Sequence, residues 1–230
     1  MKQLGHLLRW DFIHLQRNKM ITVSLLVAAA YLGIFYLLKS LGNLEELLIV
    51  MIFNDPIVMS YFFAGALLLF EKDQRTLDAL SVTPLVSGAY LGSKGVALAL
   101  VATVVALLMA WVGYGWTFNY LHFGVGTGGS ALLFAWLGCL VGRRTTGLNA
   151  FLVRSVGVFI PMALPLLLLF KVWDSPLLYL LPSAPGILLL KAAFEPIANW
   201  QYVYGYGYLL LALALTYYWG RRLLSLSPLS

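Results

Sequence analysis

Charged residues are scarce in this chain. Only 10% of its 230 residues are Asp, Glu, Lys or Arg, while 61% are hydrophobic and the mean hydropathy is +0.88. A soluble domain carries about 25% charged residues, so this composition excludes a soluble globular protein and indicates an all-α integral membrane protein. The length provides for about six spans of ~20 residues and leaves no room for a soluble enzyme domain.

Residues for redox, metal and nucleotide chemistry are equally sparse. A single Cys139 excludes an intrachain disulfide, and His6, His14 and His122 form no His-Glu-x-x-His pattern. The stretch from Gly88 to Gly95 resembles a phosphate-binding loop, but its glycines and lysine stand in the wrong order. We therefore expect no catalytic residue, no metal and no cofactor in this chain, and no bound ATP.

The apolar runs predict six membrane spans. We expect them at about Met20–Leu38, Pro56–Phe70, Tyr90–Trp116, Gly126–Gly142, Val153–Phe170 and Tyr206–Gly220. With six spans and an inside N-terminus, only Lys39, Lys171 and Lys191 of the 15 basic residues lie outside, which leaves 12 inside. The positive-inside rule thus predicts that both termini are cytoplasmic.

Residues 2–19 precede the first span and predict an interfacial helix. One face of this helix carries Leu4, Leu8, Phe12 and Leu15, and basic residues lie elsewhere on it. Asp11 falls inside the apolar stripe. It forms either a local ion pair with a neighbouring Arg or Lys, or a contact to the stretch between Phe70 and Lys94.

Asn54, Asp55 and Pro56 form a typical helix start, with a side-chain cap followed by proline in the first turn. The second span is therefore expected to begin near Pro56, and residues 44–53 to form a separate, partly embedded helix on the outer side. Asp55 either caps this helix or, with Asn54, lines a substrate path.

Glycines and prolines predict further features of the spans. Gly138 and Gly142 favour close helix packing. Pro161 and Pro165 predict a kink in the fifth span, which is either a hinge or only a matter of shape. Ser175-Pro176 and Ala184-Pro185 predict two short outer helices before the last span.

The densest charge in the chain follows the second span. Within this charged loop, residues 71–88, the segment Gln74–Leu80 predicts a short helix with Leu77 and Leu80 on one face. Thr83-Pro84 ends it, because the residue before proline is disfavoured in a helix. A short helix held in water between two spans is suited to contact with another protein.

This loop resembles that of ABC-2 type (type V) export permeases, which carry a glutamate, a charged stretch, Thr-Leu and then Thr-Pro. In this chain the matching residues run from Glu71 to Pro84, followed by Tyr90, Leu91 and Lys94. The segments Phe53–Pro56 and Ser175–Phe194 are most similar to the fluoroquinolone-export permease subunits, and the resemblance covers nearly the whole chain.

The resemblance implies one permease domain over residues 1–230, with residues 2–19 as an elbow helix and residues 71–88 as a coupling loop. It implies a prokaryotic cell-membrane exporter of drug-like or lipophilic molecules. A separate ATPase would bind ATP and Mg²⁺, and a second permease copy or a paralogue would pair with this chain. In the coupling loop, Glu71 and Arg75 would position the loop, Leu77 and Leu80 would contact the ATPase, and Thr83 and Pro84 would end the helix.

Other functions remain open at this point. Permeases that export haem, lipid or polysaccharide share the same fold, and an assembly factor without a transport path is a further alternative. An integral membrane enzyme belongs to a different class. The pair Glu45-Glu46 resembles that of CAAX-type membrane proteases, but the arginine expected after it is absent, because residues 47–53 are apolar.

Overall fold

A computed structural model shows a bundle of helices. The structure describes residues 2–38, 44–74, 87–172 and 175–223, and this part of the chain contains no strand. Its elements are α1 (Lys2–Arg17), α2 (Met20–Leu38), α3 (Leu44–Ile52), the π-helical turn η1 (Phe53–Ile57), α4 (Val58–Asp73), α6 (Ser87–Gly113), α7 (Tyr120–Arg143), α8 (Leu148–Ala163), α9 (Leu166–Leu169), α10 (Pro176–Tyr179), α11 (Ala184–Phe194) and α12 (Asn199–Leu223).

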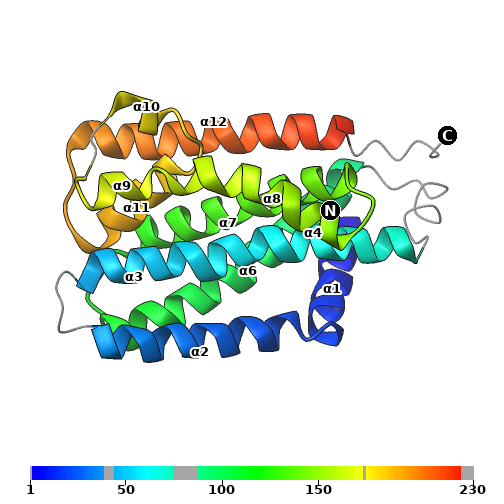
Figure 1. Cartoon of the computed structure of the whole chain (residues 1–230), viewed down its shortest axis with the longest axis horizontal. Helices are drawn as coiled ribbons and strands as arrows, with labels where there is room; N and C mark the ends of the chain where they lie inside the picture. The colour runs from blue at the N-terminus through cyan, green and yellow to red at the C-terminus, as the bar shows by residue number, and fades with distance from the viewer. Residues whose placement is uncertain (1, 39–43, 75–86, 173–174, 224–230) are drawn as a thin grey trace.

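The long helices run side by side, and α1 lies across one end of the bundle next to α2 and α6 (Figure 1). Five helical stretches are long and apolar enough to cross a membrane: Met20–Leu38, Leu44–Asp73, Gly88–Gly113, Tyr120–Arg143 and Leu148–Leu169. The 25-residue α12 lies alongside them and carries six tyrosines, which lower its hydropathy. The all-helical fold is thereby confirmed, with five spans identified by length and composition.

The second span differs from the prediction. A single helical stretch runs from Leu44 to Asp73, so Asn54-Asp55-Pro56 lies inside a helix and does not begin one. The turn η1 accommodates the proline: the Val58 N–H donates to the Phe53 carbonyl five residues back, which widens the helix locally. The expectation of a separate helix over residues 44–53 was wrong, because burial of the Leu44–Ile52 segment outweighs the local helix-start preference.

The two short helices were predicted correctly. Ser175 precedes α10 and its Oγ accepts a hydrogen bond from the Leu177 N–H at 3.4 Å, while Pro176 occupies the first helical position. The helix α11 also has a proline in its first turn, and nine of its 11 residues are buried. It packs against α7 and α12, so it forms part of the interior at that end of the bundle.

Close packing at the two α7 glycines is confirmed. A Cβ atom on Gly138 would lie 2.1 Å from the Tyr61 carbonyl oxygen, and one on Gly142 would lie 3.3 Å from the Gly65 Cα. These contacts are with the backbone of α4, so the absence of side chains on α7 allows the two helices to touch. This contact fixes α4 against α7.

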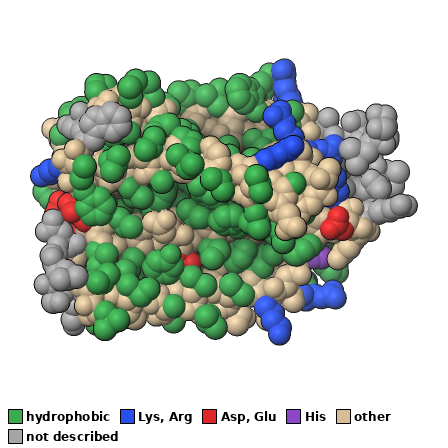
Figure 2. Space-filling model, in the orientation of Figure 1, with side chains coloured by type: hydrophobic (Ala, Val, Ile, Leu, Met, Phe, Trp, Pro, Cys, Tyr) green, Lys and Arg blue, Asp and Glu red, His purple; other side chains and the backbone are tan. Residues whose placement is uncertain are grey.

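Charges gather at the ends of the bundle. In Figure 2 most of the visible Lys and Arg side chains lie at the end where α1 packs and α12 finishes, while hydrophobic side chains cover the long sides. Large hydrophobic side chains on α2, α8 and α12 are exposed along these sides, as expected for surfaces that face lipid.

Candidate functional site at the base of the charged loop

Most residues predicted for the contact with an ATPase lie outside the described residues. These are Arg75, Leu77, Leu80, Thr83 and Pro84, and their predicted role stays a prediction. Glu71 is described: it lies in the last turn of α4, where the charged loop begins. The structure around Glu71 shows what this end of the loop is attached to.

Glu71 belongs to a buried ion cluster, which we define as Asp11, Glu71 and Lys94. The Lys94 Nζ lies 2.5 Å from Glu71 Oε1 and 3.5 Å from Asp11 Oδ1, and only 2% of the Lys94 side chain is exposed. The Tyr90 hydroxyl donates a hydrogen bond to Glu71 Oε2. The second hypothesis for Asp11, a contact to the Phe70–Lys94 stretch, is thereby confirmed.

The cluster joins three elements that are far apart in the sequence. Asp11 comes from α1, Glu71 from the end of α4, and Lys94 from the beginning of α6. The apolar face of α1 brings Asp11 inward, because Leu15 is buried and Leu8 and Phe12 pack against the same core. The helix before the charged loop and the helix after it are therefore joined directly, by the contact between Glu71 and Lys94.

One ammonium group faces two carboxylates in this cluster. Burial raises the pKa of Asp11 above its ordinary value, although the neighbouring Lys94 opposes this shift and Glu71 adds to it. Asp11 Oδ2 makes no hydrogen bond within the described part of the chain. Glu71 lies closer to Lys94 and also receives the Tyr90 hydroxyl, so Asp11 is the weaker partner of Lys94.

A second attachment starts from the next residue. The Lys72 Nζ donates a hydrogen bond to the Thr145 carbonyl at 2.9 Å, in the connection between α7 and α8. This connection is fixed further by Thr145, whose hydroxyl donates to the Gly142 carbonyl at 2.8 Å, and by Arg154, which donates to the Arg144 carbonyl. The end of α4 is thus linked to the α7–α8 connection as well as to α1 and α6.

The sequence analysis did not identify Lys94 and Lys72 as site residues. A signal for Lys94 was present: it stands within an apolar run, four residues after Tyr90, so both share one helical face. A charged side chain within a span requires a partner. Lys72 gave no such signal, because a lysine at the end of a span is also expected without any specific contact.

Asn54 and Asp55 lie in different surroundings. Asn54 is exposed, and its Nδ2 donates to the Val50 carbonyl at 2.9 Å. Asp55 is 1% exposed, and neither of its carboxylate oxygens has a hydrogen-bond partner among the described residues. The capping hypothesis for Asp55 was wrong, since the residue lies inside a helix and its side chain caps no N–H group. The structure does not bring the two side chains together.

Pro161 and Pro165 interrupt the fifth span. Pro161 lies inside α8, which ends at Ala163, and Pro165 precedes the short helix α9. The Leu164 N–H donates to the Pro161 carbonyl at 3.3 Å, so the helix tightens where the two segments meet. The helix is interrupted between the two prolines, and their role as a hinge stays a prediction.

No group of three His, Cys, Asp or Glu side chains that could hold a metal ion occurs within the described ranges. The contacts at the base of the charged loop join the end of α4 to α6 and α1 through Lys94, and to the α7–α8 connection through Lys72.

Comparison with known proteins identifies similar chains. The sequence profile of the fluoroquinolones export permease protein family matches residues 2–226. The fluoroquinolones export permease proteins of two Mycobacterium tuberculosis strains, CDC 1551 and H37Rv, are each 30% identical to this chain over 154 residues. The matched region covers 66% of this chain and 65% of the length of each relative.

Proposed function

We infer the function of this chain from its family: it belongs to the fluoroquinolones export permease protein family, and we propose that it is the membrane permease subunit of an ATP-driven ABC exporter. It would move drug-like or lipophilic small molecules out of the cytoplasm. A separate ATPase subunit would bind ATP and Mg²⁺ and supply the energy. The family and the relatives' names support export, and the ATPase and the class of cargo are our proposal.

The observation that carries this proposal is the linkage at the base of the charged loop. In our proposal residues 71–88 form the coupling loop, and an ATPase bound to Leu77 and Leu80 moves the end of α4. Because Glu71 is bonded to the buried Lys94, and Lys94 to Asp11, this movement would reach α6 and α1 together. In this scheme α1 acts as the elbow helix, and Arg75, Thr83 and Pro84 hold the loop in shape.

We further propose a topology of six spans, with α12 as the sixth and both termini in the cytoplasm of a prokaryotic cell. The basic residues at the end that carries α1 support this orientation by the positive-inside rule. The least buried candidate spans are Met20–Leu38 and Leu148–Leu169. In each of them, only 17% of an apolar stretch of 18 residues is buried inside the protein. These spans are open to lipid or to a second permease copy or paralogue.

Asp55 is our proposed polar position on the transport path. A carboxyl group buried without a partner is costly in a membrane, and such residues usually face a cavity or a pathway in some state of the protein. Exposed Asn54, at the preceding position of the same turn, would line the path in another state. Pro161 and Pro165 are the proposed hinge, because they separate α8 from α9.

The direct test is to purify the full chain from its own membranes and measure ATPase activity in the eluate. We expect an ATPase subunit to co-purify with the wild-type protein. Leu77→Asp and Leu80→Asp should release it, because a charged side chain cannot replace an apolar contact between two proteins.

Leu177→Asp is the matched control. It makes the same substitution on an exposed leucine of α10, at the opposite end of the bundle, and should retain the ATPase. Failure of any nucleotide-binding protein to co-purify with the wild-type chain would contradict the exporter proposal. Retention of the ATPase by both loop variants would contradict only the role of the two leucines.

A further inference from the structure

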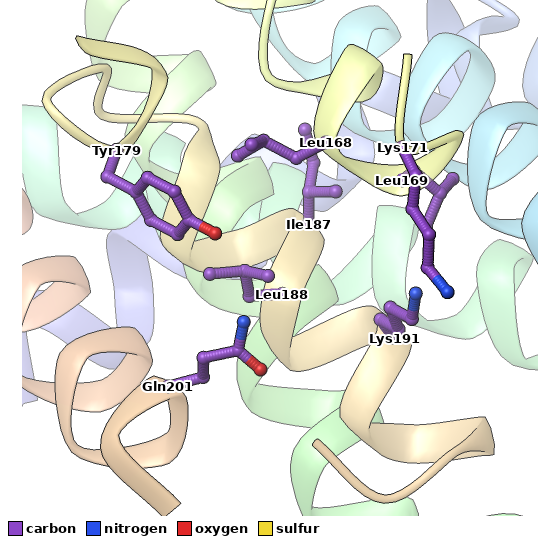
Figure 3. Close-up of a pocket in the computed structure, with 8 residues that line it drawn as sticks. All are labelled: Leu168, Leu169, Lys171, Tyr179, Ile187, Leu188, Lys191 and Gln201. Carbon is purple, nitrogen blue, oxygen red and sulfur yellow. The ribbon is translucent and has the colours of Figure 1, made fainter. Parts of the chain in front are cut away.

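A cavity of about 290 Å³ lies at the end of the bundle away from the ion cluster. Residues at the ends of α9 and α10, on α11 and at the start of α12 line it (Figure 3). Leu168, Ile187 and Leu188 form an apolar wall on one part of its surface. The cavity is large enough for a small organic group and is separate from every residue assigned above.

Two lysines supply positive charge to this cavity. In Figure 3 the amino groups of Lys171 and Lys191 point into the same space on one side of it. Lys191 has one distant acidic neighbour, since Glu195 Oε2 lies 4.0 Å from its Nζ and the Glu195 side chain is 48% exposed. An exposed pair at this distance is weak, so the charge of Lys191 remains available to a ligand.

Lys171 has a backbone conformation that is unusual for a residue with a side chain. Its φ angle is 53°, in the left-handed region, and the Val172 N–H donates to the Leu167 carbonyl at 3.2 Å, as at the end of many helices. Glycine or asparagine is the usual residue at such a position. A lysine is held here although its side chain makes the conformation less favourable.

A third donor faces the same cavity. Gln201 Oε1 accepts a hydrogen bond from the Ala198 N–H at 3.1 Å, and this contact turns the side-chain Nε2 toward the cavity (Figure 3). The Tyr179 side chain lies on the same side as Gln201. No carboxylate is among the residues that line the cavity in the described part of the chain.

We propose that this cavity binds an amphipathic anion. Its carboxylate or phosphate group lies beside the amino groups of Lys171 and Lys191, and its apolar body lies against the wall formed by Leu168, Ile187 and Leu188. Two ammonium groups beside an apolar surface match this class of ligand, because charge-assisted hydrogen bonds hold the anion while the wall removes its apolar part from water. The source of the anion is either an anionic lipid or an exported amphipathic acid.

This inference goes beyond the proposed transport function: only the exported acid as a source rests on that function, and binding itself is measured on the permease alone. The full chain is placed in phosphatidylcholine nanodiscs and its lysines are acetylated for a short time with and without a probe. Mass spectrometry reports each lysine separately. The probes are decanoate and, as the matched cation, decyltrimethylammonium.

We expect decanoate at twice its dissociation constant to slow the acetylation of Lys171 and Lys191 about threefold. Lys19 is the internal control, since it is exposed, has a similar φ angle of 55° and lies beside α1 at the other end of the bundle. Its acetylation should not change. Leu188→Asn should reduce the protection of the two lysines, because it removes part of the apolar wall, and Leu177→Asn, at an exposed position of α10, should not.

The proposal is overturned if decanoate leaves both cavity lysines unprotected, or if the cation protects them equally. Dihexanoyl phosphatidylglycerol and dihexanoyl phosphatidylcholine then distinguish the two sources of the anion. Stronger protection by phosphatidylglycerol than by decanoate identifies an anionic lipid as the ligand. Protection by decanoate without protection by phosphatidylglycerol identifies an amphipathic acid.

Discussion

Glu71 and Lys72 are consecutive residues at the end of α4, and their side chains bind two different parts of the protein. Glu71 is bonded to Lys94 of α6, and Lys72 to the Thr145 carbonyl in the connection between α7 and α8. The last turn of α4 is therefore attached to the rest of the protein at two separate places. In the proposed coupling mechanism, a movement of the charged loop would act on α6 and on the α7–α8 connection through this one helical turn.

The first prediction concerns the ion cluster. Lys94→Met removes the buried ammonium group from between two carboxylates that are each 14% exposed, and we expect a loss of about 3–5 kcal/mol in the free energy of unfolding. Unfolding of the purified protein in mixed micelles with increasing denaturing detergent measures this loss. Lys19→Met is the control at an exposed lysine and should cost little.

A neutral cluster should recover most of that loss. In the triple variant Asp11→Asn/Glu71→Gln/Lys94→Met no uncompensated charge remains, so its free energy of unfolding should lie closer to that of the wild type than that of Lys94→Met does. Equal stability of the triple and single variants would show that the loss comes from packing and not from charge.

The second prediction concerns pH. Burial raises the pKa of Asp11 above its ordinary 3.8, so the folded protein holds this proton more tightly than the unfolded chain does. The contribution of Asp11 to stability is therefore complete below about pH 3.8 and is lost as the pH rises through the raised pKa. Asp11→Asn cannot ionise. As the pH rises from about 4 to about 8, the unfolding temperature of this variant should therefore increase relative to that of the wild type.

Thermal unfolding of both proteins over this range tests the pH prediction. Asp73→Asn, at an exposed acid of α4, is the control and should follow the wild type. A constant difference between Asp11→Asn and the wild type over the whole range would show that Asp11 ionises in the folded protein as it does in the unfolded chain.

The third prediction concerns helix packing. Gly138→Ala places a Cβ atom 2.1 Å from the Tyr61 carbonyl, and this neighbour is backbone, so α4 and α7 must move apart. We expect a loss of about 1–3 kcal/mol in the free energy of unfolding. Gly124→Ala on the same helix has no atom within 4 Å of the new Cβ and should be neutral or slightly stabilising. Similar behaviour of the two variants would contradict the close contact.

The fourth prediction concerns Asp55. Asp55→Leu removes a buried carboxyl group that has no partner among the described residues, so the free energy of unfolding should rise by about 1–3 kcal/mol. ATP-driven uptake of a lipophilic dye into inverted vesicles, which corresponds to export from the cell, should fall, because the polar position on the path is lost. Asp73→Leu, at an exposed acid on the same helix, should give no gain in stability. Unchanged export by Asp55→Leu would remove Asp55 from the path.

The fifth prediction concerns the proposed hinge. Pro161→Ala restores an N–H group and removes the proline ring from α8, so the helix should become straighter and at least as stable. If the bend moves during transport, export should slow while the ATPase still co-purifies. Wild-type export by both Pro161→Ala and Pro165→Ala would show that the prolines only shape the helix.

The sequence predicts features that depend on neighbouring residues. The predicted span Met20–Leu38 has the same first and last residues as α2, because the apolar run between them contains no charged residue and no proline at which a helix could end. The beginnings of α10 and α11 follow from Ser175-Pro176 and Ala184-Pro185, where the proline fixes the backbone whatever surrounds it. The glycines of α7 likewise indicated close packing, though not that α4 is the partner.

Features that depend on distant residues could not be predicted in the same way. Asn54-Asp55-Pro56 is a strong local helix start, yet burial of α3 continues the helix through it and η1 absorbs the proline. The partners of Lys94 come from residues 23 and 83 positions earlier in the chain, Glu71 and Asp11. The charge of Lys94 alone indicates that it needs an acidic partner. Which acidic residues are its partners depends on how α1 packs against α6, and this packing cannot be read from neighbouring residues.

The enclosed helix α11 has a consequence for the biosynthesis of this protein. With 11 residues it is too short to cross a bilayer, and its buried surface is completed by α7 on one side and α12 on the other. Since α12 follows α11 in the chain, α11 cannot reach its final surroundings until α12 has also been synthesised. The cavity that these two helices line is therefore completed only after the helices that precede α12 have been made.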